Sequence, residues 1–262
     1  MRPHDGHSPI TFPASGVTGK LRADLLLVKK GLFATRARAQ EAIAAGLVVA
    51  NGTVVRKPSE TLAEHADISA QAPHPYVSRG GVKLAAALDH FGVDPAGQAC
   101  LDVGSSTGGF SDVLLKRGAA HVTAVDSGRE QFHVRLRGHP RITLHEGTDI
   151  RLLTQDARAA APTLAVIDVS FISLSLVLPA VAELLAPAAT IVALIKPQFE
   201  AGRGNIGKGG IVRDEAVQAQ VVERVLAELA SLGFVPQHPV PSPITGGDGN
   251  REFLVAAARI LP

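Results

Sequence analysis

The sequence of 262 residues predicts an α/β protein with a mostly parallel sheet, a C-terminal antiparallel hairpin and a small α+β domain in front. Three observations support this class. Apolar runs that end on an acid or a lysine alternate with helical patterns between residues 76 and 232, as in buried parallel sheets. A glycine-rich turn joins one of these runs to a helix. Short helices and an Asn-Gly hairpin occupy residues 21–60.

Composition excludes several classes of protein. Hydrophobic residues make up 46% of the chain, enough for a sizeable core, so the protein is neither fibrous nor disordered. The one cysteine, Cys100, excludes an intrachain disulfide and fits a reducing compartment. Residues 1–20 show no export signal and are expected to form a flexible tail. No uncharged apolar run approaches the roughly 18 residues of a membrane span. We therefore expect a cytoplasmic protein without membrane contact.

Basic residues concentrate near the N-terminus. Between Lys20 and Lys57 there are eight basic residues against two acidic ones, in a chain whose net charge is only +2. A compact basic segment on a mildly acidic body is expected of a nucleic-acid-binding module.

The same segment has an ordered pattern of short elements. Leucines at helical spacing predict a helix that stops at Gly31, and Thr35 is expected to cap a second helix that ends at Gly46. Asn51-Gly52 predicts a tight turn between two apolar runs. Leu-Arg-Ala-Asp-Leu-Leu-Leu, Thr-Arg and Gly-Leu-Val-x-x-Asn-Gly, in this order, resemble the RNA-binding domain first named from ribosomal protein S-four.

This resemblance implies that the helices and the hairpin present basic side chains to structured RNA. Each of these side chains taken singly is more often part of a solvated helix face, but together they favour phosphate contact. We assign residues 21–66 to this domain, 67–76 to a polar linker and 77–262 to a larger domain. The implied RNA contacts in the small domain are Arg22, Lys29, Lys30, Arg36, Arg38, Arg56 and Lys57.

The glycine-rich turn follows the apolar run 100–103. Its spacing departs from the dinucleotide fingerprint, because Ser106 stands where the second glycine belongs, and it lacks the Gly-Lys-Ser/Thr of a phosphate-binding loop. Asp-x-Gly-x-x-x-Gly-Gly instead resembles the first motif of S-adenosylmethionine (SAM) methyltransferases; a turn without a ligand is the alternative. The implied cofactor contacts are Asp102, Gly104, Ser105, Ser106, Gly108 and Gly109.

Other polar residues follow the remaining apolar strands. Asp126 ends the run 121–126, where an acid can accept hydrogen bonds from a ribose, and Asp149 follows the run 142–145, where it could reach an adenine amino group or only shape a turn. Asp168 and Lys196 end two further runs, and we expect them to form an ion pair. Because ligands bind beyond the carboxyl ends of parallel strands, we expect four of these side chains to converge on one rim: Asp102, Asp126, Asp168 and Lys196.

Three features complete the larger domain. Lys83 lies in the first turn of a helix, where a cation is unfavourable for the helix dipole. A glycine-rich loop, residues 201–213, carries Arg203 and Lys208 and suits closure over a polyanionic substrate. After a helix capped by Asp214, two strands near residues 233–244 and 251–257 form the antiparallel hairpin, and Glu252 begins the second of them.

With Lys83, Asp168, Lys196 and Glu252 in this order, residues 76–257 resemble the FtsJ-like ribose 2′-O-methyltransferases, which use a Lys-Asp-Lys-Glu tetrad. Together with the leading RNA-binding domain, the resemblance narrows to the TlyA (haemolysin A) family of rRNA methyltransferases. It implies a Rossmann-like SAM methyltransferase sheet, Lys196 as general base toward a ribose 2′-hydroxyl, ribosomal RNA or ribosomal subunits as partner, no metal and no obligate protein partner.

Two alternatives stay open. A ribosome-assembly factor that holds SAM without catalysis would keep the glycine turn, but an intact tetrad disfavours it. A membrane-lytic haemolysin is suggested by the historical family name alone and is disfavoured by the missing export signal and membrane span.

Overall fold

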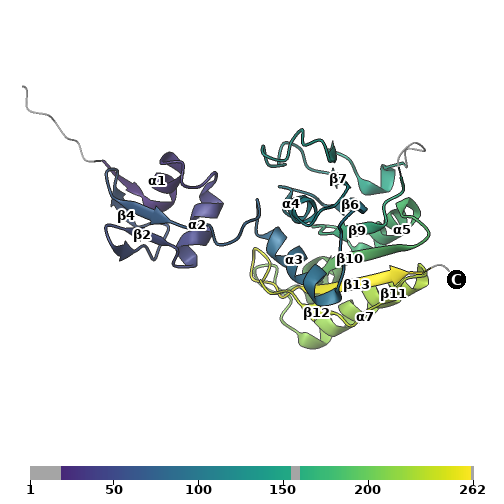
Figure 1. Ribbon diagram of the computed structural model, residues 1–262. Helices are drawn as coiled ribbons and strands as arrows, with labels where there is room; N and C mark the ends of the chain where they lie inside the picture. Colours follow the sequence, from purple (N-terminus) through teal and green to yellow (C-terminus); the bar gives the residue numbers. More distant parts are fainter. Residues whose placement is uncertain (1–18, 155–159, 261–262) are drawn as a thin grey trace, which may run out of the picture. The chain divides into compact units, whose positions relative to one another are not determined.

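The computed structural model describes residues 19–154 and 160–260. The chain divides into two compact units between Pro75 and Tyr76, and each is described by itself (Figure 1).

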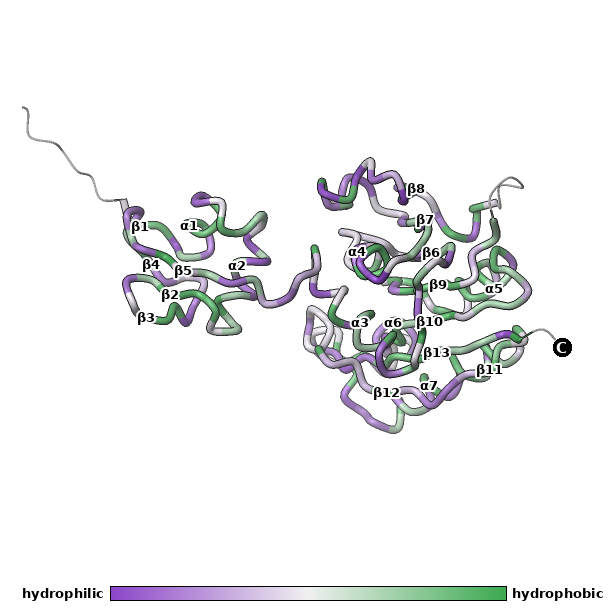
Figure 2. Tube along the Cα trace, in the orientation of Figure 1, coloured by the Kyte–Doolittle hydropathy of each residue, from purple (hydrophilic) through white to green (hydrophobic). Residues whose placement is uncertain are grey.

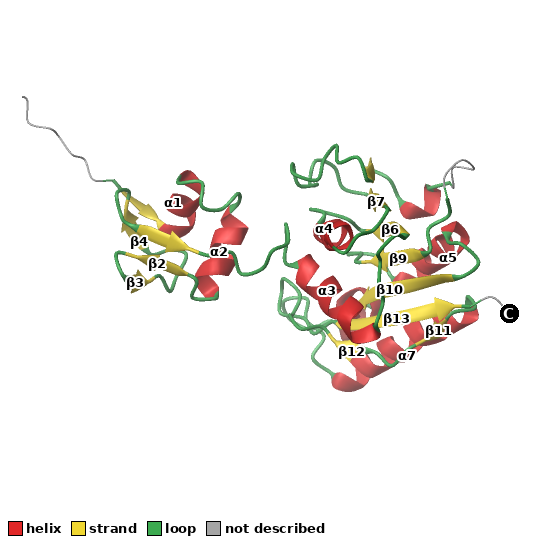
Figure 3. Cartoon of the chain, in the orientation of Figure 1, coloured by secondary structure: helices red, strands yellow, loops and turns green. Residues whose placement is uncertain are grey.

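The small unit, residues 19–75, combines two helices with two small sheets (Figure 3). Both predicted helices form, and Thr35 Oγ1 accepts a hydrogen bond of 3.3 Å from the backbone nitrogen of Arg38. Asn51 and Gly52 have φ angles of 48° and 77°, which fit the predicted type I′ turn. The elements are β1 (Lys20–Arg22), α1 (Ala23–Lys29), α2 (Arg36–Ala44), β2 (Val48–Ala50), β3 (Thr53–Val54), β4 (Thr61–Ala63) and β5 (Ile68–Ala70).

The sheets of the small unit differ from the sequence-based expectation. The expected flexible tail, residues 1–20, lies outside the described residues except for its last two. Lys20, expected in that tail, opens a strand, β1, which pairs antiparallel with β4. Segment 67–76, expected to be a linker, contains β5, which pairs with β2 and adds a third strand to the hairpin. Each of these strands has only three residues, too few for an alternating pattern to distinguish it from a connector.

Asp24 is a buried charge at the start of α1. Its side chain is 0% exposed and accepts hydrogen bonds from Arg22 at 3.0 and 3.1 Å, from Arg36 at 3.1 Å and from Gln40 at 2.8 Å. The Arg22 guanidinium, with help from Gln40 and Arg36, holds the pKa of this carboxyl well below its usual range. Two of the bases expected to contact RNA therefore stabilise the fold of the unit.

Asp24→Asn should loosen the small unit by about 2 kcal/mol, because two guanidinium groups would lose their charged acceptor. Hydrogen exchange of the amides in α1, α2 and β2 measures this loss. Asp67→Asn is the matched control, since it removes the same charge from an exposed side chain of the same unit. Equal exchange rates in the two variants would contradict a structural role for Asp24.

The larger unit, residues 76–260, is built on an eight-stranded mixed sheet. Its strands are β6 (Ala99–Val103), β7 (His121–Asp126), β8 (Ile142–Glu146), β9 (Leu164–Ile167), β10 (Ala189–Ile195), β11 (Val235–Pro236), β12 (Val240–Pro241) and β13 (Phe253–Arg259). The order is β11-β13-β10-β9-β6-β7-β8, with β12 also paired to β13. The strands from β10 to β8 are parallel, and β13 runs antiparallel to β10, β11 and β12. The predicted parallel sheet and C-terminal hairpin are confirmed.

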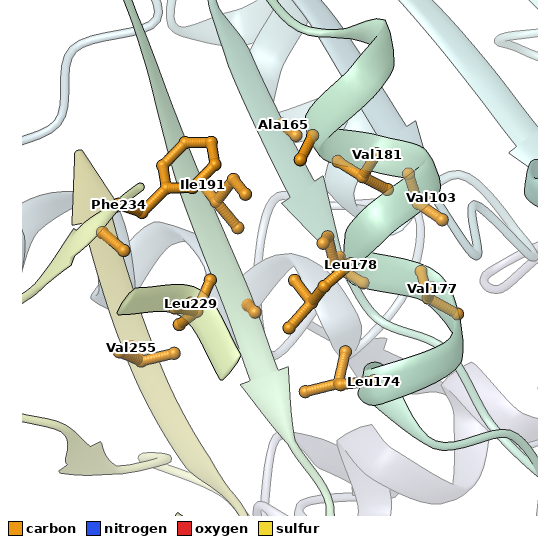
Figure 4. Close-up of a cluster of buried hydrophobic side chains, with 14 of the residues drawn as sticks. Val103, Ala165, Leu174, Val177, Leu178, Val181, Ile191, Leu229, Phe234 and Val255 are labelled. Carbon is orange, nitrogen blue, oxygen red and sulfur yellow. The ribbon is translucent and has the colours of Figure 1, made fainter. Parts of the chain in front are cut away.

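Helices cover both faces of this sheet. They are α3 (Gly80–Phe91), α4 (Gly109–Lys116), α5 (Leu174–Leu184), α6 (Pro197–Glu200), α7 (Glu215–Ser231) and the short 3₁₀ turns η1 (Ile150–Leu152) and η2 (Arg203–Asn205). One core lies under α5 and α7, and Figure 4 shows Leu178 and Val181 of α5 beside Ile191 of β10. The opposite core lies under α3 and α4.

The central strands are buried on both faces, so they read as continuous apolar runs. The tube in Figure 2 is largely green along β10 and β13. Because both faces of such a sheet are covered, its polar side chains are found in the loops at the ends of the strands. Strand order reverses between β6 and β9, and ligands bind at such a switch point in open α/β sheets.

Candidate functional site

The glycine turn after β6 lies against the loop after β9. Gly104 has a φ of 81°, and a Cβ atom there would overlap the backbone carbonyl of Asp168. Gly108 has a φ of 87°, and its added Cβ would lie 2.7 Å from a Leu136 methyl carbon. Any side chain at Gly104 would push the loop after β6 away from the loop after β9. Glycine is therefore required there, both for the positive φ and for the close approach of the two backbones.

A cavity of about 520 Å³ opens beside this turn, between the ends of β6, β7 and β9. Asp126 lines it and accepts hydrogen bonds from the backbone nitrogens of Ser106 (2.8 Å) and Gly128 (2.6 Å). This volume lies within the range of small-molecule sites, roughly 300–1,000 Å³. The wall includes polar and apolar groups, among them Gly104, Ser106, Asp126, Gln131, Asp149, Ile150, Asp168, Ser170 and Phe171.

The predicted cofactor residues divide into two groups. Gly104, Ser106, Asp126 and Asp149 line the cavity, and Asp149 also holds Arg151 at 2.5 Å. The other four predicted residues, Asp102, Ser105, Gly108 and Gly109, do not line the cavity and pack on the far side of the glycine turn. Asp102 and Ser105 are buried, Gly108 packs on Leu136 and Phe132, and a side chain on Gly109 would overlap the Ser78 hydroxyl.

Asp102 lies beneath the glycine turn rather than in the cavity. Its side chain is 0% exposed, and Ser111 donates a hydrogen bond of 2.6 Å to Oδ2. Burial, opposed by this hydrogen bond, raises the pKa of Asp102 to about 7. The sequence placed Asp102 correctly on the rim strand, but helix α4 covers its carboxyl group.

The first of two ion pairs lies beyond the ends of β9 and β10. Lys196 Nζ lies 2.6 Å from Asp168 Oδ1 and donates a hydrogen bond of 2.9 Å to Ser170 Oγ. The two charged side chains are 10% and 20% exposed. The predicted pair therefore forms at the wall of the cavity, which Asp168 and Ser170 both line.

The second ion pair joins Lys83 of α3 to Glu252, which directly precedes β13. Lys83 Nζ lies 2.5 Å from Glu252 Oε2, and the side chains are 8% and 2% exposed. Lys83, whose charge is unfavourable at the start of a helix, thus has as its partner the carboxylate of Glu252, 169 residues further along the chain.

Sheet register brings the two pairs to one place. Ile195 pairs with Phe253 at the end of the β10 and β13 ladder, so Lys196 and Glu252 leave adjacent strands at the same end. Gly80 begins α3 against the first pair, since a Cβ there would lie 3.8 Å from Asp168 Oδ2. Sheet register therefore brings Lys196 and Glu252 to the same end of adjacent strands, and Asp168 of the first pair lines the cavity.

Two residues near these pairs were missed by sequence reasoning. Asn250 is 1% exposed; it accepts a hydrogen bond from Val212 N (3.1 Å) and donates one to Gly210 O (2.9 Å), so it ties loop 201–213 to the hairpin. Phe171 is 91% exposed with a φ of 64°. An isolated asparagine among glycines and an aromatic residue after a strand end were the only signals.

Most bases expected to contact RNA have partners inside the small unit. Lys29 pairs with Glu64 at 2.8 Å, Lys30 donates to the carbonyl of Ala66 at 3.2 Å, and Arg38 contacts the ring of His74 at 3.0 Å. Arg56 and Lys57 are exposed, as is Lys208 in the larger unit. The side chain of Arg203 lies outside what the structure describes.

Comparison with protein families assigns the fold and the site to one class. Residues 76–259 match the FtsJ-like methyltransferase family, and residues 21–68 match the S4 domain. The chain belongs to the FtsJ-like methyltransferases, and as a member of this class it uses S-adenosylmethionine. The cavity, the glycine turn and the carboxylates of Asp126 and Asp149 fit such a ligand in size and polarity.

Relatives place the chain within one family of that class. A candidate rRNA methyltransferase of Bacillus subtilis, YqxC, is 46% identical, covering 90% of this chain and 85% of the relative. The 16S/23S rRNA (cytidine-2′-O)-methyltransferase TlyA of Mycobacterium tuberculosis is 41% identical, covering 90% and 89%. A solved structure of a candidate hemolysin from Streptococcus thermophilus is 42% identical with a TM-score of 0.73, covering 93% and 90%. The chain belongs to the TlyA (haemolysin A) family.

Two absences complete the site description. Among residues 19–154 and 160–260, no group of three or more His, Cys, Asp or Glu side chains is arranged to hold a metal ion. In the same described ranges, no helix has the length and apolar character needed to cross a membrane.

The raised pKa of Asp102 predicts a pH-dependent stability. Between about pH 4 and pH 7 the folded state keeps a proton that the unfolded state releases, so wild-type stability should fall as pH rises and level off above pH 7. Asp102→Asn should abolish this pH dependence. In the wild type, the free energy of unfolding should change by about 2–4 kcal/mol between pH 4 and pH 7. Urea unfolding at about pH 5 and pH 8 measures it. The exposed Asp248→Asn should keep the wild-type slope.

Proposed function

We propose that this protein methylates a ribose 2′-hydroxyl of structured ribosomal RNA, with Lys196 as general base. The observation that carries this proposal is the Lys196–Asp168 pair at 2.6 Å on the wall of the cavity, next to the Lys83–Glu252 pair at 2.5 Å. Two lysines and two carboxylates beside a small-molecule cavity suit proton removal from a poorly acidic hydroxyl.

Each member of the tetrad has a role in the proposed reaction. Lys196 first releases its ammonium proton to water; the neutral amine then takes the hydroxyl proton as the oxygen attacks, and the carboxylate of Asp168 stabilises the ammonium that forms again. Glu252 fixes Lys83, which holds the ribose through a hydrogen bond to the reacting oxygen. When bound, S-adenosylmethionine supplies an electrophilic methyl group on sulfur. Alignment of the reacting atoms in a water-poor site supplies much of the acceleration.

The remaining cavity residues suit the methyl donor. Asp126 is placed to accept hydrogen bonds from ribose hydroxyls, and Asp149 to accept one from the adenine amino group. The glycine turn approaches the ligand with backbone at Gly104 and Ser106.

The small unit is proposed to dock RNA. Its match to the S4 domain and its exposed bases Arg56 and Lys57 support this role, and Lys208 with Arg203 would extend the contact on the larger unit. Ribosomal RNA or ribosomal subunits are the proposed partner because the TlyA relative is named for rRNA. A cytoplasmic location follows from that substrate.

Lys196→Met should lower kcat for methyl transfer by about 10²- to 10⁴-fold and leave the Kd for S-adenosylmethionine unchanged, since Lys196 itself is not among the residues that line the cavity. Transfer of tritiated methyl to ribosomal subunits measures kcat, and calorimetry measures Kd. Lys116→Met, at the far end of α4, is the control and should react at the wild-type rate.

Three results would contradict this proposal in different ways. Unchanged transfer by Lys196→Met would refute the general base. No transfer by the wild-type chain, together with tight binding of S-adenosylmethionine and of subunits, would favour an assembly factor. Lysis of membranes by purified protein would revive the haemolysin reading.

Arg56→Glu with Lys57→Glu should weaken RNA binding and flatten the plot of log Kd against log salt concentration by about 2, because two phosphate contacts are lost. Filter binding at several salt concentrations measures the slope. The swap Arg56→Lys with Lys57→Arg keeps both charges and should retain the wild-type slope. A change of affinity with no change of slope would contradict phosphate contact.

A further inference from the structure

Glu200, at the end of α6, is a buried carboxylate that the proposed reaction does not use. It is 7% exposed overall, and its side chain is 2% exposed. One oxygen, Oε2, accepts a hydrogen bond of 2.6 Å from Ser173 Oγ, and the other, Oε1, accepts one of 2.7 Å from the backbone nitrogen of Leu174. Arg224 of α7 lies 3.1 Å from Oε2 and also donates to the Glu200 carbonyl at 2.6 Å.

These contacts join the two loops that carry the first ion pair. Ser173 ends the loop that begins at Asp168, and Glu200 ends the helical turn that begins after Lys196. Both oxygens of the Glu200 carboxylate therefore bond to the same end of the first loop.

Each loop is held by a backbone hydrogen bond at the end where it leaves its strand. The nitrogen of Asp168 donates to the carbonyl of Val103 at 2.9 Å, which fixes the start of the first loop to β6. Pro197 begins α6, and Phe199 N bonds to the carbonyl of Lys196 at 3.0 Å, which fixes the second loop to β10. Only the far ends depend on Glu200.

The first loop also contains backbone strain. Phe171 has a φ of 64°, which is unfavourable for a bulky residue and persists only where the surroundings hold it. Release of Ser173 and Leu174 from Glu200 would let this loop relax. The backbone of Asp168 would stay on β6, but Ser170 would move away from Lys196 and the Asp168 side chain would be free to turn from it.

We propose that Glu200 is a positioning residue that holds Asp168 and Ser170 at bonding distance from the Lys196 amine. This inference deepens the proposed function and rests on it. Its contacts suit a carboxylate, because Oε1 accepts from the first residue of α5 and Oε2 lies beside the Arg224 guanidinium.

A purely structural role is the competing account, in which Glu200 only caps α5. The two accounts differ in what they predict for a folded variant. A cap lowers the Tm and leaves the rate of the folded enzyme alone, whereas a positioning residue also lowers kcat, because misplacement by about 1 Å costs up to about 10²-fold in rate.

The test compares Glu200→Ala with Arg259→Ala. Arg259 bonds to the carbonyls of Ala186 (3.0 Å) and Ala182 (3.3 Å) at the opposite end of α5, so its loss loosens the same helix far from the ion pair. Both variants should have a lower Tm. Only Glu200→Ala should lose about 10- to 100-fold in kcat, with the Kd for S-adenosylmethionine unchanged.

Two further variants sharpen the result. Glu200→Gln keeps an acceptor for Leu174 and should recover most of the lost rate. Ser173→Ala removes only the 2.6 Å bond from the loop and should lose rate to a smaller extent, which keeps the test decisive if Glu200→Ala does not fold. Wild-type kcat in Glu200→Ala, or in Ser173→Ala when Glu200→Ala does not fold, would overturn the proposal.

Failure of the inference is distinguishable from failure of the proposed function. If Lys196→Met is inactive while Glu200→Ala keeps the wild-type rate, the general base stands and the positioning role falls. If Lys196→Met is fully active, the proposed reaction falls first.

Discussion

The larger unit depends on ion pairs that offset the free-energy cost of burying two lysine ammonium groups. Lys196 and Lys83 lie among apolar strands and helices with at most a tenth of each side chain exposed, so each needs a carboxylate within bonding distance. The fold supplies Asp168 and Glu252 because β9 and β10 end, and the antiparallel β13 begins, at the same edge of the sheet. The first of these pairs reaches the cavity through Asp168, and the proposed proton transfer rests on that contact.

Close approach of backbone is the second constraint on this edge. The loop after β6 touches the loop after β9 at Gly104, where a side chain would overlap the Asp168 carbonyl. The cavity therefore borders the ion pair directly, and no side chain from the glycine turn stands between them. Buried polar groups behind these loops, such as Asp102 with Ser111 and Glu200 with Ser173, hold the backbone in this arrangement. The proposed catalytic geometry would therefore depend on polar contacts one layer below the surface.

In the small unit, several of the basic residues proposed to contact RNA also stabilise the fold. Arg22 and Arg36 surround buried Asp24, and Lys29 and Arg38 bond to groups of the same unit. A count of basic residues therefore overstates the surface that is free to bind phosphate. The exposed side chains of Arg56 and Lys57 lie near the hairpin, so we expect the electrostatic contact with RNA to be centred there.

The sequence by itself determined the class of fold, the strand that ends in each functional residue, the type I′ turn and the order of the tetrad. These features follow from local rules, because apolar runs, caps and glycine spacing report on backbone conformation within a few residues. Only the tertiary structure decided that Lys83 pairs with Glu252, that Asp102 is covered by α4, that Asn250 and Glu200 clamp loops, and that β5 belongs to a sheet. The reason is that these contacts join segments far apart in the chain, where burial and the choice of partner depend on packing rather than on neighbouring residues.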